Sequence, residues 1–397
     1  MQQQVLSFDT GQTVQVVDFV QKATFRASLL PNSLPTQGFR NVNNPARSLP
    51  SPFGWNSDGK SLWIDTRGNN VEVAIDSSRT SGGSNLRFTD IWNGNLPPDD
   101  PQNEKASTTH AFYIVNTFHD ILFQYGFTPA AGNFQMNNNN KGGIGSDAVI
   151  VRNQNSDSFN NANFATPPDG QSGVLNLYLF TITNPPRDSS FDSMIVLHEY
   201  AHGLSNRLTG GPGNSACLQN TESWGLGEGW SDAIAIFMTI KSGMVSRNIG
   251  IGTWVSGRSQ GVRRYLYSPD MNVNPLLFSN LKDESNVHRI GEIWATILMD
   301  LLWMLVDFAG FGTNWNDASQ NFGNIVLLKI VVGAMMLQPC NPTFTQARDA
   351  ILQAEFQYYK GAYRCRLWRG FAKRGLGSDS SQGQGNFANG YQIPSNC

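Results

Sequence analysis

The chain changes its hydrophobic pattern near residue 190. Up to that point, short apolar runs typical of β-strands alternate with stretches rich in Asn, Gly and Pro. The clearest runs are residues 71–75, 148–151 and 174–180. Residues 108–125 have helical periodicity instead, and Ser107 or Thr108 can cap that helix. We therefore expect a β-rich first half that contains one helix.

After residue 210, apolar positions recur every three or four residues, as in helices that bury one face. This pattern predicts helices at residues 228–242, 290–309, 320–338, 343–360 and 362–374. Another helix should begin after Asp192 and end at Gly210-Gly211. A chain of 397 residues can bury a large core and should divide into two lobes. The prediction is an α+β protein with a β-rich lobe over residues 1–208 and a mainly helical lobe over residues 209–397.

The helix at this boundary contains His-Glu-Tyr-Ala-His at positions 198–202. On a helix, His198 and His202 share one face and can bind one Zn²⁺ as neutral imidazoles. Glu199, one position round the helix, can act on a zinc-bound water, whose pKa falls to about 7. Chance would produce this motif in roughly one chain in several hundred of this length and composition, so a third ligand is required.

A second pair of residues four positions apart, Glu228 and Asp232, precedes the apolar run Ala-Ile-Ala-Ile-Phe-Met. Glu228 can complete the zinc site, and Asp232 can hold the distal N–H of a ligand histidine. The alternative is a solvated helix face. We favour the metal site, because carboxylates that open an apolar helix would otherwise be buried without a partner.

His288 also precedes a strongly apolar segment, and Asp283 lies shortly before it. Peptide hydrolysis at zinc forms an oxyanion that a facing donor or cation stabilises. His288 could supply that donor, with Asp283 orienting its ring. A histidine in this position can equally be a capping or core residue, but the zinc motif favours the catalytic role. His110 and His119 are interpreted as packing or surface residues.

Longer strings extend these observations over most of the chain. They include Gly-Leu-Gly-Glu-Gly-Trp-Ser-Asp at 225–232, Val-His-Arg-Ile-Gly-Glu-Ile-Trp at 287–294, Asn-Ala-Asn-Phe-Ala-Thr-Pro-Pro-Asp-Gly at 161–170 and Cys-Asn-Pro-Thr-Phe at 340–344. With the zinc motif, they resemble the catalytic domain of the fungalysin family of secreted fungal metallopeptidases, which is related to thermolysin. The resemblance implies a two-lobed thermolysin-like fold with the zinc-motif helix at the interface between the lobes.

The same resemblance implies a role for each matching position. The zinc ligands would be His198, His202 and Glu228, for one Zn²⁺ per chain. Glu199 would be general base and proton shuttle, and Asp232 the outer partner of His198. His288 would stabilise the oxyanion, with Asp283 as its carboxylate. Substrate backbone would bind to the Asn161 side chain and the Ala162 carbonyl of an edge strand, and to Arg263 or its neighbour Arg264.

Two features of the thermolysin pattern are missing. The tyrosine with which thermolysin-like enzymes contact the oxyanion aligns with Leu218 of this chain. The sequence therefore does not identify an oxyanion donor besides His288. No Asp or Glu lies between Asp232 and Asp270, where thermolysin has a carboxylate cluster for calcium. A calcium site is therefore not supported by the sequence.

Charge and hydropathy narrow the possible partners. A formal net charge of −2 gives no reason to expect nucleic acid or an anionic membrane. The densest basic run, residues 364–374, is interpreted as a solvated helix face. The apolar stretches 293–309 and 325–337 are interrupted by charged residues, so both are expected to be buried helices. The expected partners are protein and peptide substrates.

The cysteines fit a secreted protein. Four cysteines allow three pairings, and four free thiols are the alternative. Cys340–Cys365 would close a helix-sized loop and leave Cys217 with Cys397. Residues 1–4 lack the features of a signal peptide, so we expect a mature or truncated form. The resemblance implies an inhibitory propeptide before maturation, and we expect a monomer.

The resulting hypothesis is a secreted zinc metalloendopeptidase that prefers a hydrophobic residue after the cut. One alternative is a zinc aminopeptidase on the same scaffold, which would need acidic residues that hold a free α-amino group. We identify no such segment. Another alternative is a catalytically silent zinc protein, which would be expected to lack Glu199 or His288, and this chain has both.

Overall fold

The computed structural model describes residues 2–6, 13–18, 22–244, 246–383 and 385–397, so Met1 lies outside the described residues. The protein is a mixed α+β chain, as predicted. Its helices are α1 Pro101–Gln124, α2 Ser193–Leu208, α3 Thr221–Thr239, α4 Thr253–Ser256, α5 Val287–Ala309, α6 Gly323–Leu337, α7 Phe344–Tyr359 and α8 Arg364–Lys373. Its strands are β1 Gln2–Leu6, β2 Thr13–Asp18, β3 Thr24–Ala27, β4 Arg40–Asn43, β5 Val71–Ala74, β6 Arg87–Phe88, β7 Val149–Arg152, β8 Ala162–Ala165, β9 Val174–Leu177, β10 Leu179–Phe180, β11 Arg187–Asp188, β12 Ser381–Gly383 and β13 Asn386–Ala388.

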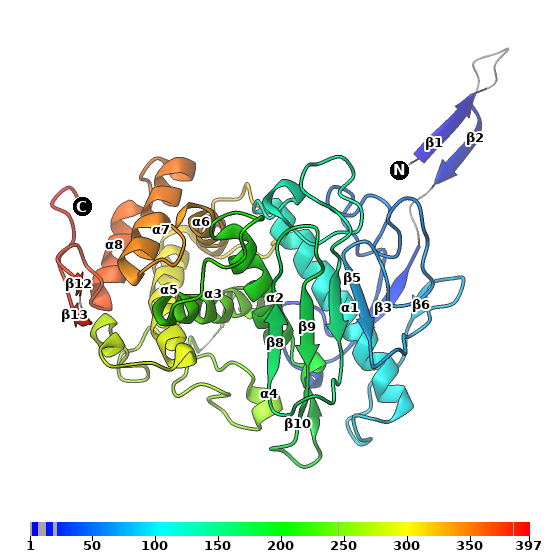
Figure 1. Cartoon of the computed structure of the whole chain (residues 1–397), viewed down its shortest axis with the longest axis horizontal. Helices are drawn as coiled ribbons and strands as arrows, with labels where there is room; N and C mark the ends of the chain where they lie inside the picture. Colours follow the sequence, from blue (N-terminus) through cyan, green and yellow to red (C-terminus); the bar gives the residue numbers. More distant parts are fainter. Residues whose placement is uncertain (1, 7–12, 19–21, 245, 384) are drawn as a thin grey trace.

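The sheet nearest to the zinc-motif helix has the strand order β5-β7-β9-β8. Its first three strands are parallel, and β8 runs antiparallel to β9, with Ala162 opposite Leu177 and Ala165 opposite Val174. β8 is therefore an edge strand, with a row of backbone groups that this sheet leaves unpaired. In Figure 1, α2 and α3 lie between this sheet and the helices α5 to α8.

The hydrophobic core extends through all of these elements. Buried apolar side chains form one cluster that runs from the sheet and α1 through α2 and α3 into α5 and α6. α5 packs against α3, α6 and α8. Residues 293–309 and 325–337 belong to helices α5 and α6, most of whose residues are buried, as predicted. Every helix in the described part of the chain is too short or too polar to span a membrane.

α1 begins earlier than the hydrophobic pattern predicts. Pro101 is its first residue, and the Asp100 side chain caps it by accepting a hydrogen bond from the Gln102 N–H at 2.9 Å. Ser107, expected as a cap, is buried inside the helix and bonds to Asp188 at 2.5 Å. The prediction missed the start because the first turns are polar and carry no apolar periodicity.

α3 also begins earlier, at Thr221 with Asn220 as its cap, so Glu228 lies well inside the helix instead of opening it. Glycine is unfavourable inside helices, so the glycines of this segment led the prediction to place the start of the helix too late. Here glycine permits close packing between α3 and α5. A methyl group at Gly229 would lie 2.6 Å from the Cβ of Trp294 on α5, which is closer than real side chains approach.

The interpretation of residues 364–374 as a solvated face is wrong for Arg374. Its guanidinium is fully buried, forms an ion pair with Asp300 on α5, and donates to the carbonyl oxygens of Asn274 at 2.6 Å and Ser268 at 2.9 Å. A buried charge is stable only with such partners. Arg374 thereby ties α8 to α5 and to the segment that precedes it.

The predicted disulfide pairing is wrong. The bonds are Cys217–Cys340 and Cys365–Cys397, with Cα atoms 4.4 Å and 5.0 Å apart. Tertiary structure overrides sequence spacing here, because the end of α6 packs beside the loop between α2 and α3. The Asn341 N–H donates to the Cys217 carbonyl at 2.8 Å, which places Cys340 next to Cys217.

Peptide mapping without reduction should yield the two linked pairs Cys217–Cys340 and Cys365–Cys397. The first spans a sequence separation of 123 residues and the second 32. Replacing both cysteines of the first pair by serine should lower the free energy of unfolding by about 2–5 kcal/mol, and by more than the same change in the second pair. Denaturant titration measures both losses. A linked peptide that joins Cys340 to Cys365 would contradict the pairing.

Candidate metal centre and substrate cleft

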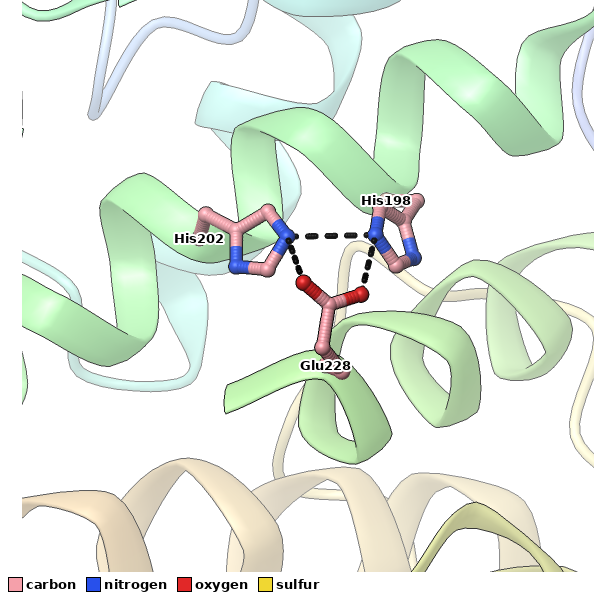
Figure 2. Close-up of side chains that lie close together, drawn as sticks. All are labelled: His198, His202 and Glu228. Atoms are coloured by element: carbon pink, nitrogen blue, oxygen red, sulfur yellow. Dashed lines mark hydrogen bonds and ion pairs between the residues drawn. The ribbon is translucent and has the colours of Figure 1, made fainter. Parts of the chain in front are cut away.

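α2 presents the two histidines of the motif to a cavity. The helix begins at Ser193, where the Asp192 side chain accepts a hydrogen bond from the Met194 N–H at 3.2 Å. His198 and His202 lie one turn apart on its cavity face, and their Nε2 atoms are 3.1 Å apart. Figure 2 shows both rings turned toward the neighbouring helix α3.

α3 brings Glu228 to both rings. Its Oε2 lies 3.4 Å from Nε2 of His198, and its Oε1 lies 3.6 Å from Nε2 of His202 (Figure 2). Donor atoms of a tetrahedral zinc site with bonds of 2.0–2.1 Å are about 3.3 Å apart. Oε2 of Glu228 is buried, and no hydrogen-bond donor reaches it within the described ranges. The three side chains therefore fit a Zn²⁺ ion in spacing and in unsatisfied charge.

Asp232 lies one helical turn beyond Glu228 and is fully buried. Its Oδ1 is 2.7 Å from Nδ1 of His198. The same carboxylate accepts two hydrogen bonds from the Arg263 guanidinium, at 2.7 Å and 2.9 Å, and one from the Tyr267 hydroxyl. Burial opposes its charge, but Arg263 and His198 hold the pKa of Asp232 well below its usual range.

Burial and neighbouring charges shift the pKa values of the residues in this cluster in different directions. Burial disfavours a charged His198 ring, but Asp232 outweighs it and raises the pKa of His198 to about 10. A metal at Nε2 must displace that proton. Burial lowers the pKa of His202 to about 4, so this ring is neutral and offers a lone pair at neutral pH. Burial also raises the pKa of Glu199, which lines the cavity beside the histidines, to about 7.

His288 lines the same cavity from the first turn of α5. Its ring is 55% exposed, and its Nε2 lies 3.6 Å from Oε2 of Glu228. It is not part of the compact group of donor atoms formed by His198, His202 and Glu228. The structure does not bring Asp283 to His288, because Asp283 is exposed and makes no ion pair with the ring.

Asn161 and Ala162 line the same cavity, which has a volume of about 470 Å³. Ala162 is the first residue of β8, so the expected edge strand borders the candidate metal centre. Asn160, just before it, has a left-handed backbone with φ of 56°, and its side chain accepts a hydrogen bond from the Thr181 N–H at 2.7 Å. This contact fixes the turn that leads into β8.

The edge strand β8 is packed directly against α2. A methyl group at Gly203, next to His202, would lie 2.9 Å from the ring of Phe164 on β8, so glycine is needed for this approach. Arg207, one turn later, is fully buried and donates to the carbonyl oxygens of Pro167 at 2.7 Å and Gln171 at 2.8 Å. Both carbonyls belong to the loop between β8 and β9, so α2 positions the strand as well as the histidines.

Arg263 and Arg264, which the sequence could not separate, differ in the structure. Arg263 lines the cavity and is held by Asp232. Arg264 pairs with Glu292 at 2.5 Å and does not line the cavity. Tyr267 was not predicted at all, because no motif spacing marks a side chain that reaches Asp232 from a loop. The structure favours Arg263 as the arginine of the cleft.

The protein comparisons agree with this arrangement. The family model described as Fungalysin metallopeptidase (M36) matches residues 24–380. Extracellular metalloproteinase 2 of Arthroderma otae is 42% identical over 96% of this chain and 62% of its own length. Extracellular metalloproteinase 10 of Coccidioides posadasii is 42% identical over 98% of this chain and 64% of its own length.

The chain thus spans slightly less than two thirds of the length of these relatives. The family match nevertheless covers α2, α3 and the first turn of α5, which hold every side chain of the candidate metal centre. On the extent of this match and the identity to the relatives, the chain belongs to the fungalysin metallopeptidase family.

Proposed function

We propose that this chain is the catalytic part of a zinc endopeptidase that hydrolyses protein and peptide substrates outside the cell. One observation carries the proposal. The Nε2 atoms of His198 and His202 are 3.1 Å apart, and each lies 3.4–3.6 Å from a carboxylate oxygen of Glu228, at a cavity that Glu199 and an edge strand also line. These are the parts needed to bind a metal, move a proton and align a peptide.

Bound by these three side chains, Zn²⁺ would polarise a peptide carbonyl and lower the pKa of a water molecule to about 7. Oδ1 of Asp232 lies 2.7 Å from Nδ1 of His198, which leaves Nε2 of the same ring on the side of Glu228 and the cavity, where it would bind the metal. Arg263 and Tyr267 hold Asp232 in turn. These outer partners would hold the His198 ring in place and select its metal-binding tautomer once the metal displaces the proton from Nε2.

Glu199 is the general base in this proposal. Its carboxylate takes a proton from the attacking water and delivers it to the amide nitrogen of the leaving product. His288 faces the cavity from α5 and is exposed enough to donate a hydrogen bond from its ring to the carbonyl oxygen as negative charge develops there.

The substrate is proposed to add to β8 as a further antiparallel strand. The unpaired backbone of this edge strand, the Ala162 carbonyl and the Asn161 side chain would hold the peptide backbone. Arg263 would contact the carbonyl beyond the scissile bond. The apolar lining beside it supports a hydrophobic residue after the cut, and consists of Phe180, Ile195, Ile251 and Val262.

The proposed setting is extracellular, with an inhibitory propeptide before maturation and a monomeric enzyme. The relatives are named extracellular metalloproteinases, and the two disulfides suit an oxidising compartment. A peptide with a blocked N-terminus distinguishes an endopeptidase from an aminopeptidase, because only the former cleaves it. A catalytically silent protein would bind zinc and cleave neither form.

The purified protein should contain one Zn²⁺ per chain, measured by elemental analysis. His202→Ala and Glu228→Ala should each lose the metal, because each removes one of three donors. Asp232→Asn should retain it with about 10- to 100-fold weaker affinity, since it affects the metal only through His198. Stoichiometric zinc in both ligand variants would rule out this site.

Glu199→Gln should keep zinc but lose peptide hydrolysis by about 10²–10⁴-fold, because glutamine cannot take the proton from water. Zinc content and turnover of a blocked peptide are measured on the same preparation. Near-normal turnover by a fully zinc-loaded variant would refute the assigned role.

His288→Ala should lower kcat/KM by roughly a hundredfold with zinc content unchanged, because an oxyanion donor is worth about 3 kcal/mol. Asp283→Asn is the matched control. It lies on the same approach to α5 without contacting the ring, so its kcat/KM should stay near that of the wild type. Loss of zinc from His288→Ala, or equal losses in both variants, would contradict the prediction.

A further inference from the structure

Trp224 is an exposed tryptophan at the rim of the cleft. It lies in the first turn of α3, lines the same cavity as the metal-binding side chains, and is 53% exposed. The other nine tryptophans of the chain are buried or partly buried. No ring–ring contact in the described part of the chain involves Trp224. A large apolar surface is therefore left open beside the reaction centre.

The contacts between α2 and α3 fix the end of the cavity at which Trp224 lies. Asp232 pairs with His198, and Glu228 pairs with both His198 and His202. Residues nearer the N-terminus of α3 therefore lie beside residues nearer the C-terminus of α2. One turn before Glu228, Trp224 is placed toward Asn206, which also lines the cavity.

The opposite end of the cavity is the apolar pocket beside Arg263. Arg263 is held by Asp232. Of the α3 residues Trp224, Glu228 and Asp232, which are successive turns apart, Asp232 is the farthest from Trp224. A methyl group at Gly252 would lie 3.1 Å from Ile195 and 3.2 Å from Val262, so these two side chains converge there. In the proposed function, this end receives the residue after the cut. The Trp224 end must then receive residues before the cut.

We propose that Trp224 forms a wall of a second side-chain subsite, which selects a large apolar or aromatic residue before the scissile bond. The inference rests on the proposed peptidase function. Four helical residues place Trp224 about 6 Å along α3 from Glu228. An extended peptide advances about 3.3 Å per residue, so the side chain in question belongs to one of the two residues before the cut.

The segment that carries Trp224 is anchored rather than free. Oδ1 of Asn341 accepts hydrogen bonds from the Gln219 N–H at 2.8 Å and the Ser223 hydroxyl at 3.1 Å. The Cys217–Cys340 disulfide joins the same two segments. A ring held by a fixed backbone loses little conformational entropy when it contacts a ligand, so such an aromatic side chain contributes strongly to recognition.

The test compares wild type, Trp224→Ala, Trp224→Phe and the control Phe356→Ala, which removes another exposed helical aromatic ring outside the cavity lining. Blocked peptides carry Ala, Lys, Leu or Phe at each of the two positions before the cut, with the residues after it constant. The wild type and the control should prefer Phe over Ala by about tenfold in kcat/KM at one position. Trp224→Ala should lose that preference, and Trp224→Phe should retain most of it.

Zinc content and melting temperature should match in all four proteins, because Trp224 and Phe356 are exposed. If Trp224→Ala is active and keeps the wild-type preference at both positions, the subsite proposal is wrong but the proposed endopeptidase function stands. A change confined to selectivity after the cut also overturns it. If neither the wild type nor Phe356→Ala cleaves any blocked peptide, the proposed endopeptidase function fails, and the subsite fails with it.

Discussion

The fully buried carboxylate of Asp232 is the constraint around which the site is organised. A charge without water must be matched by partners, and here these are His198, Arg263 and Tyr267. His198 comes from α2, and Arg263 and Tyr267 come from one later loop, so satisfying this carboxylate of α3 draws α2, α3 and that loop together. The ring of His198 is thereby held with Nε2 toward Glu228.

The charges around that carboxylate also fit the proposed divalent metal. Three buried carboxylates, Glu199, Glu228 and Asp232, face one guanidinium, that of Arg263. Once a metal has displaced the proton of His198 and Glu199 is ionised, three negative charges and one positive charge give a formal −2, which one dication would neutralise. The two uncompensated charges are those of Glu199 and Glu228, on the cavity side. The protein thus neutralises the carboxylate of Asp232 with its own side chains, whereas those of Glu199 and Glu228 would be neutralised by the proposed ion.

Local periodicity made the helix-borne part of the site predictable. Residues four apart on a helix share a face, so His198 with His202 and Glu228 with Asp232 could be paired from their spacing alone. Contacts that depend on tertiary packing could not be predicted in this way. The partner of Cys340 is set by where α6 ends, and Tyr267 reaches Asp232 from a loop without a motif. The glycines that allow α3 to approach α5 resemble helix breakers in the sequence.

Under the proposed function, the edge strand β8, which packs against α2 at Gly203, would restrict the proteins that the cleft can process. A chain can pair with a strand edge only if its own backbone is extended and its hydrogen bonds are free. Residues in a helix meet neither condition, and residues inside a sheet are extended but have no free backbone hydrogen bonds. The cleft would therefore sample folded proteins only where they open locally, and digestion rates would follow the local unfolding free energy of each target more closely than its sequence.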